Sequence, residues 1–210
     1  MDEDKLNIIK PFGPAIAKVK MPEKIINTLN DHVDKIVNNE ELSKKFDNGK
    51  YLAGNVKQEL SLSKEISEES GWSSFLSNAT RAWIKFCIGK NIKEFHIYNS
   101  WIVRQFSNEY NPVHMHSGHI SGAGFLKVPS TFGETFQKDK KNLNGKLVLI
   151  HGSKSFLCNS KYEIIPEVGD FYIFPHYLMH TVYPFKDTND ERRSISFNAK
   201  VDDNIFTEIV

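Results

Sequence analysis

The feature that most constrains the fold of this chain is a change of periodicity near residue 93. From there onward, short alternating runs rich in β-branched and aromatic residues follow one another, with turn residues between them. Many short strands separated by tight turns are typical of a β-sandwich or barrel. The strands are predicted in KEFHIYNSWIVRQF, SGAGFLKVP, GKLVLIHG, YEIIPEVGDFYIFP, HTVYPF and RRSISFNAKV.

Before residue 93 the apolar residues have the spacing of helices. In MPEKIINTLNDHVDKIVNN they recur every three or four positions after Pro22, and a second helix is predicted around residues 70–90, ending near Gly89. The apolar stripe of the second helix consists of Trp72, Phe75, Leu76, Ala79, Trp83, Phe86 and Cys87. PFGPAIAKVKM predicts a loop that leads into a short strand, and KFDNGKYLAGNVKQELSLS predicts a loop.

These patterns together predict one α+β, mainly β, domain that spans residues 1–210. Residues 1–92 would form a helical support region with a first short strand, and residues 93–210 would form the β core. The opening MDEDKLNIIKPF lacks the apolar segment of a secretory signal, and no apolar run is long enough to span a bilayer. Cys87 and Cys158 lie far apart and outside any CxxC pattern, which favours reduced thiols. We therefore expect a cytoplasmic protein without membrane contact.

Three histidines occur close together in NPVHMHSGHISGAGFLKVP. Side chains alternate along a strand, so His114 and His116 would point to the same face. His180, which follows an apolar strand and a turn, would supply a third nitrogen from a neighbouring strand. This spacing predicts a facial metal site that leaves three positions open. His119 is the alternative to His116 if the strand begins later.

The segment ERRSISFNAK adds an acid-binding pattern to the histidines. With period two, Arg192 and Ser194 share the polar face of the last strand, whereas Arg193 lies on the other face. A guanidinium binds a carboxylate through two hydrogen bonds, and the serine hydroxyl would add a third. The sequence thus predicts a site for a metal ion and for an organic acid.

The ordered set of HxH, a distant histidine and RxS resembles the Fe(II)- and 2-oxoglutarate-dependent oxygenases, from Tyr98 to Asn198. It is similar to the branch in which a histidine stands at the usual aspartate position. The resemblance implies a double-stranded β-helix (jelly roll), Fe(II) on His114, His116 and His180, and 2-oxoglutarate on Arg192 and Ser194, with O2 as oxidant. Many relatives have a tyrosine where this chain has Gln105, so a hydrogen bond from Gln105 to the cosubstrate is a further expectation.

The resemblance implies a dioxygenase, with a hydroxylase as the expected activity and no catalytic residue beyond the metal site. Two alternatives remain: a cupin-like three-histidine enzyme that does not use 2-oxoglutarate, and a non-catalytic jelly-roll binding module. A small molecule or a peptidyl side chain is the expected substrate. Lys plus Arg (27) nearly equal Asp plus Glu (26), so nothing favours a nucleic-acid partner. A homodimer stays open.

Overall fold

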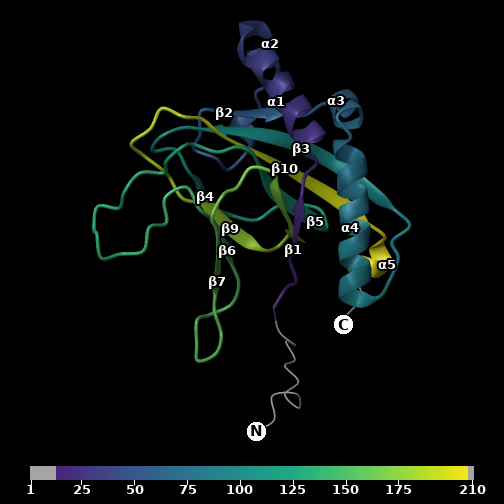
Figure 1. Ribbon diagram of the computed structural model, residues 1–210. Coiled ribbons are helices and arrows are strands. Elements are labelled where there is room, and N and C mark those ends of the chain that lie inside the picture. Colours follow the sequence, from purple (N-terminus) through teal and green to yellow (C-terminus); the bar gives the residue numbers. More distant parts are fainter. Residues whose placement is uncertain (1–12, 208–210) are drawn as a thin grey trace.

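The computed structural model describes residues 13–207 and contains two antiparallel β-sheets (Figure 1). The larger sheet has the order β1-β8-β5-β10-β3-β2 and the smaller one has the order β4-β9-β6-β7. Antiparallel sheets stacked in this way form a jelly roll, which confirms the predicted fold class. The strands are β1 (Ala17–Lys20), β2 (Gln58–Ser61), β3 (Phe95–Gln105), β4 (Asn111–His114), β5 (Ile120–Lys127), β6 (Leu147–Ile150), β7 (Lys161–Ile164), β8 (Asp170–Pro175), β9 (Met179–Val182) and β10 (Arg192–Val201).

The helices cover the face of the large sheet that is turned away from the small sheet. Helix α1 contributes to this cover, and its five buried residues are those of the predicted apolar stripe: Ile25, Ile26, Leu29, Val33 and Ile36. Burying a side chain of this size stabilises the fold by about 1.5–3 kcal/mol. The helices are α1 (Glu23–Val37), α2 (Glu40–Phe46), the short 3₁₀ helix η2 (Gly49–Tyr51), α3 (Lys64–Glu69), α4 (Trp72–Ile88) and α5 (Asp203–Phe206).

Helix α4 occupies the predicted range, and Gly89 ends it in a left-handed conformation with φ 71°. Its buried face follows positions four apart, at Trp72, Leu76, Thr80 and Ile84. Phe86, which was assigned to the apolar stripe, is instead 92% exposed, and Cys87 is exposed too. The prediction was wrong for these two residues because they lie outside the row that contacts the sheet.

The N-terminal region also contributes to the large sheet. The predicted short strand is confirmed as β1, which pairs with β8 at one edge of the sheet. At the other edge, β2 pairs with β3 inside the segment that was predicted as a loop. Residues 1–12, including MDEDKLNIIKPF, lie outside the described residues. Within residues 13–207, no helix is both long and apolar enough to cross a membrane.

Strand β10 lies between β5 and β3 and separates the two cores of the molecule. Ile195 and Phe197 belong to the core beneath the helices, whereas Arg192, Ser194 and Ser196 line a cavity between the sheets. The predicted alternation of this strand is therefore confirmed. It directs every second side chain of β10 toward the histidines of the small sheet.

Candidate metal and acid-binding site

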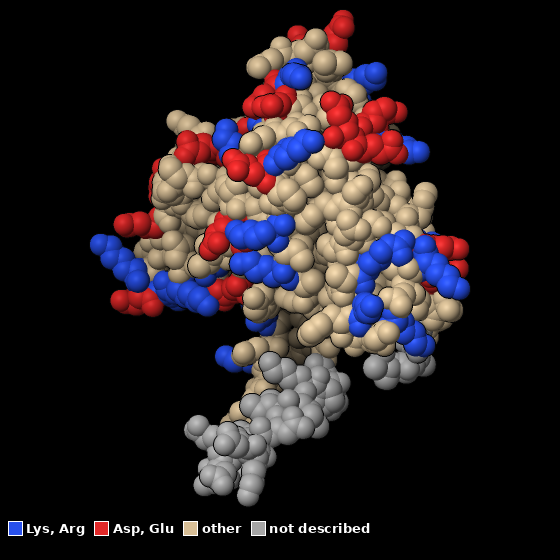
Figure 2. Space-filling view, turned by 45° about the vertical axis from the view of Figure 1, so that its right-hand side comes forward, with Lys and Arg blue, Asp and Glu red and all other residues tan. Residues whose placement is uncertain are grey.

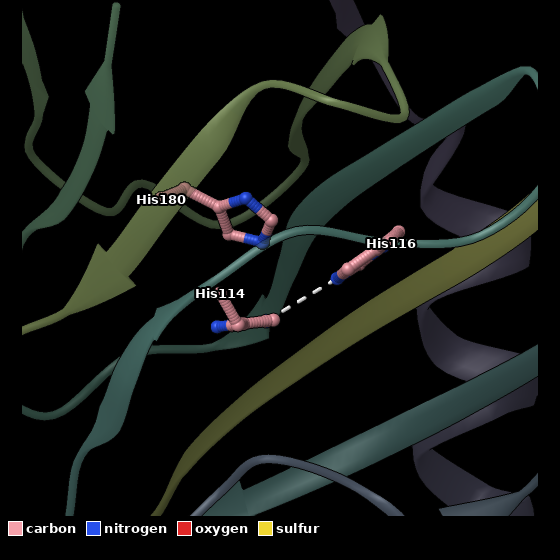
Figure 3. A group of neighbouring side chains, drawn as sticks. All are labelled: His114, His116 and His180. Atoms are coloured by element: carbon pink, nitrogen blue, oxygen red, sulfur yellow. Dashed lines mark hydrogen bonds between the residues drawn. The ribbon is translucent and has the colours of Figure 1, made fainter.

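Three imidazoles converge between the sheets (Figure 3). His114 ends β4, His180 lies on β9 directly opposite it in the strand register, and His116 follows β4. One ring nitrogen from each residue lies within 4.8 Å of the others. The structure thus brings together the three histidines that the sequence predicted as ligands.

Hydrogen bonds orient all three rings through their Nδ1 atoms. His114 Nδ1 donates to the Pro112 carbonyl at 2.7 Å, and His180 Nδ1 donates to the Leu178 carbonyl at 2.9 Å. The Ser121 hydroxyl donates to the Phe197 carbonyl at 2.7 Å, so its oxygen accepts from His116 Nδ1. This arrangement leaves each Nε2 with a free lone pair. Fixing the tautomer through the second ring nitrogen is how proteins prepare histidine for a metal.

The imidazoles are held in the neutral form that binds metals. Burial, together with repulsion from the other two rings, lowers the pKa of His116 to about 2. Burial and His114 lower the pKa of His180 to about 4, and burial also lowers the pKa of His114. The Nε2 atoms of His114 and His116 are 3.3 Å apart (dashed line in Figure 3), and when both rings carry their proton on Nδ1, neither Nε2 atom donates to the other. Three neutral nitrogens facing one point fit Fe(II), which imidazole ligands suit.

Arg192 lines the same cavity as His114 and His180 and is 1% exposed. Its Nη1 donates to Gln105 Oε1 at 2.9 Å, and the guanidinium lies 5.1 Å from the Phe125 ring centre. Its Nε has no hydrogen-bond partner, and no carboxylate pairs with it among residues 13–207. Burial accordingly lowers the pKa of Arg192 to about 9. A buried cation without a counter-ion is a site for an anion.

The next residue shows the contrast across the strand. Arg193 points toward α1, where its Nη2 donates to Asp34 at 2.8 Å and its Nε donates to Glu191 at 3.0 Å. Arg193 is therefore neutralised within the fold, whereas Arg192 is not. The assignment of Arg192 rather than Arg193 to the site agrees with this geometry.

The two predicted assistants of Arg192 differ in what they offer a ligand. Ser194 lines the cavity beside Arg192. Gln105 also lines it, but its Oε1 accepts from Arg192 and its Nε2 donates to the Glu109 carbonyl at 2.6 Å. Both ends of the Gln105 amide are thus engaged. Gln105 holds the guanidinium in place, and its expected hydrogen bond to a cosubstrate stays a prediction.

Three other polar candidates lie outside the cluster. His119 accepts from the Val201 amide at 3.3 Å and stacks on Phe206, so His116 and not His119 completes the group. His176 lies in the turn after β8, and its Nδ1 donates to the His116 carbonyl at 3.2 Å. Asp170 pairs with lysines of β1 at the sheet edge, so it is not a ligand here.

Aromatic side chains enclose part of the site. Ring centres of Trp101 and Phe174 lie 5.3 Å from His116 and 5.1 Å from His180, respectively. Phe125 lies against Arg192. Phe171 does not contribute to this enclosure, because it lies on the opposite face of β8 from Phe174 and packs against Trp72 beneath the helices.

Two residues of the site were not identified from the sequence. Ser121 is completely buried and holds His116, and Asn111 lines the cavity with Arg192 and His114. The alternation of β5 could have placed Ser121 on the inner face. Nothing in the sequence indicates that its hydroxyl meets His116.

The fold and these residues define a jelly-roll protein with a candidate centre for a metal ion and an acid. A family model described as "Putative 2OG-Fe(II) oxygenase" matches residues 99–198, close to the range of the sequence resemblance. The match covers just under half of the chain and shows that this region is similar to that family, whose members are oxidoreductases. The family uses Fe(II), 2-oxoglutarate and O2. No curated protein sequence matches the chain.

Solved structures with the same fold support the architecture. A prolyl-4-hydroxylase from Pseudomonas putida superposes with a TM-score of 0.53 at 13% identity, covering 87% of this chain and 91% of that chain. A viral collagen prolyl hydroxylase from Paramecium Bursaria Chlorella virus-1, in a 2OG complex, has a TM-score of 0.52 at 14% identity, covering 88% of this chain and 94% of that chain. HygX from Streptomyces hygroscopicus, with nickel and 2-oxoglutarate bound, has a TM-score of 0.54 at 9% identity, covering 89% of this chain and 82% of that chain. At these identities the likeness concerns the fold.

Proposed function

We propose that this chain is a non-haem Fe(II)- and 2-oxoglutarate-dependent dioxygenase that hydroxylates a substrate C–H bond. One observation supports this most strongly: the cavity lined by two histidines of the three-histidine cluster, His114 and His180, also contains a buried guanidinium without a counter-ion. A metal site alone has no need of a buried cation. A ligand that chelates a metal at one end and carries a carboxylate at the other satisfies both groups, and 2-oxoglutarate has this form.

In this proposal the residues of the chain have distinct tasks. His114, His116 and His180 hold the ion through Nε2, and Arg192 with Ser194 binds the distal carboxylate. Trp101 and Phe174 exclude water beside the rings. When bound, Fe(II) supplies the chemistry that couples O2-dependent decarboxylation of 2-oxoglutarate, to succinate and CO2, with C–H oxidation.

The substrate in this proposal is a small molecule or a peptidyl side chain. Peptidyl substrates are supported by the two prolyl hydroxylases of similar fold. On the face in view in Figure 2, Lys and Arg gather in one arc at the lower right and elsewhere lie beside Asp and Glu, so no basic stripe of the kind typical of nucleic-acid binding crosses this face. We further propose that the protein is found in the cytoplasm. A homodimer is compatible with this function and is testable by light scattering.

The test is an anaerobic titration of the protein with Fe(II) and then 2-oxoglutarate, monitored by the charge-transfer absorption of an iron-bound 2-oxo acid. We expect the band in the wild type. His180→Ala should lose it, because one of the three nitrogens is gone. Arg192→Ala should need at least 10-fold more cosubstrate, since a charge-assisted pair contributes about 1.5–3 kcal/mol.

The other outcomes separate the competing functions. Iron binding without a band, together with indifference to Arg192→Ala, would contradict the proposal and favour a three-histidine cupin-like enzyme. Absence of iron binding would contradict it as well and favour a binding module. Arg193→Ala is not a suitable control, because Arg193 contributes to the stability of the fold. Lys138→Ala, in an exposed loop, is the control for effects of substitution and purification alone.

A further inference from the structure

A buried carboxyl group lies behind the wall of the cavity, on the strand that was predicted as a loop. Glu59 of β2 is 1% exposed. It is directly opposite Val103 in the strand register, and Val103 lines the cavity, so both side chains point to the same face of the sheet. Its Oε2 has no hydrogen-bond partner among the described residues. Neither the family match nor the mechanism above assigns a role to this group.

Glu59 contacts Asn111, which lines the same cavity as Arg192. The interaction with the Asn111 side chain favours the charged form of the Glu59 carboxyl and so lowers its pKa, against the larger effect of burial. Gly54 packs against both: a Cβ atom at this position would lie 2.8 Å from Glu59 Oε1 and 3.0 Å from Asn111 Nδ2. The absence of a side chain at Gly54 therefore allows the loop to close over the pair. Asn111 belongs to the small sheet and Arg192 to the large one, so they approach the cavity from opposite sides.

We propose that Asn111 is a further specificity-determining residue for the carboxylate of the cosubstrate, and that Glu59 is the positioning residue that sets which atom of the Asn111 amide faces the cavity. This inference rests on the proposed function, because it assumes an acid bound at Arg192.

The chemistry of the pair gives the direction of the effect. An ionised carboxylate only accepts hydrogen bonds, so it attracts the Nδ2 donor of Asn111. The amide oxygen of Asn111 then faces the cavity, where it repels the carboxylate of a bound acid. A protonated Glu59 donates its O–H to the amide oxygen. Nδ2 is then turned toward the cavity and donates to the bound carboxylate. Protonation also removes a buried negative charge from the vicinity of the acid.

The surroundings of Glu59 favour such a protonation change near neutral pH. Burial, followed by repulsion from Asp47, raises the pKa of Glu59 to about 7. The backbone at Leu60 bridges to Asp47, which keeps this carboxylate beside the pair. The charged or titratable residues that line the cavity next to Asn111 are Arg192, His114 and His180. Glu59 is neutral below this pKa and charged above it, so acid binding should weaken as the pH rises through it.

The experiment measures the dissociation constant of 2-oxoglutarate, with Fe(II) saturating and O2 excluded, near pH 6 and near pH 8. Each variant is compared with the wild type by the ratio of its dissociation constants near pH 8 and near pH 6, so that a pH effect common to the proteins cancels. We expect the wild type to bind at least about threefold more weakly near pH 8. Glu59→Gln can donate or accept at either pH, and it should lose this difference. Asn111→Ala should bind about threefold more weakly than the wild type near pH 6. Ser61→Ala, on the same strand, is the matched control and should behave as the wild type.

The inference is overturned if Glu59→Gln keeps the wild-type pH difference or if the wild type shows none. It is also overturned if Asn111→Ala loses less than about threefold near pH 6. Circular dichroism establishes that each variant is folded, and if Asn111→Ala does not fold, the Glu59→Gln comparison decides. A wild type that binds no 2-oxoglutarate at either pH would contradict the proposed function itself, and this result is distinct from a failure of the Glu59–Asn111 pair alone.

Discussion

The Ser121 hydroxyl determines which ring nitrogen of His116 is free to bind a metal. It accepts from His116 Nδ1 while donating to the Phe197 carbonyl. Ser121→Ala removes this acceptor and leaves the ring free to change tautomer. We expect the affinity for Co(II), used as a spectroscopic probe for the site, to fall roughly 10- to 100-fold. Ser196→Ala is the matched control, because Ser196 lines the cavity without a bond to a histidine. Equal losses in both variants would contradict a specific role for Ser121.

The three clustered histidines and Arg192 could be predicted from the sequence, but Ser121, Asn111 and the hydrogen bonds of the site could not. Period two along β10 was enough to place Arg192 in the cavity and Arg193 outside it. Which of His116 and His119 joins the cluster depends on where the chain leaves β4, and local pattern does not determine that. The engagement of both ends of Gln105 depends on contacts with residues 109 and 192, which only the folded chain brings together.

The strand β5 shows a constraint that acts on a whole element. Gly122 lies opposite Phe197 and Ile173 in the two neighbouring strands. A Cβ atom there would lie 2.6 Å from the Tyr172 carbonyl oxygen and 2.8 Å from the Phe197 ring. We expect Gly122→Ala to lower the free energy of unfolding by about 1–3 kcal/mol through overpacking. Urea denaturation measures this change, and a stability equal to the wild type would contradict it. Glycine in a strand interior is the sequence signal of such a close approach.

Elements with strong periodicity were predicted well, whereas the edge strand β2 was not. Helix α1 has all five of its stripe residues buried, because the stripe alone decides which face meets the sheet. Strand β2 has the sequence QELS, with a single apolar residue and no alternation. It is a strand because β3 offers it hydrogen-bond partners, and such tertiary pairing leaves no local pattern. The same strand carries Glu59, so the missed element also concealed a candidate functional group.

At the scale of the whole molecule, the candidate ligands would connect the two sheets. His114 and His180 belong to the small sheet, Arg192 belongs to the large sheet, and the cavity lies between them. A metal ion and an acid that bind here bind only the folded chain, since unfolding separates these residues. Each ligand at 100 times its dissociation constant should therefore stabilise the protein by about 2.7 kcal/mol. For a chain of this size, 1 kcal/mol raises Tm by roughly 2–4 °C.

We therefore expect Mn(II), which avoids iron oxidation, to raise Tm by roughly 5–10 °C, and 2-oxoglutarate to add a similar increment only when the metal is present. The order follows from the geometry, because the acid gains its second point of attachment at the ion. Arg192→Ala should keep the rise in Tm that the metal causes and lose most of the rise that 2-oxoglutarate causes, whereas His180→Ala should lose both. Calorimetry of the three proteins measures these shifts. A 2-oxoglutarate increment that persists in Arg192→Ala would show that the buried guanidinium is not the group that binds the acid.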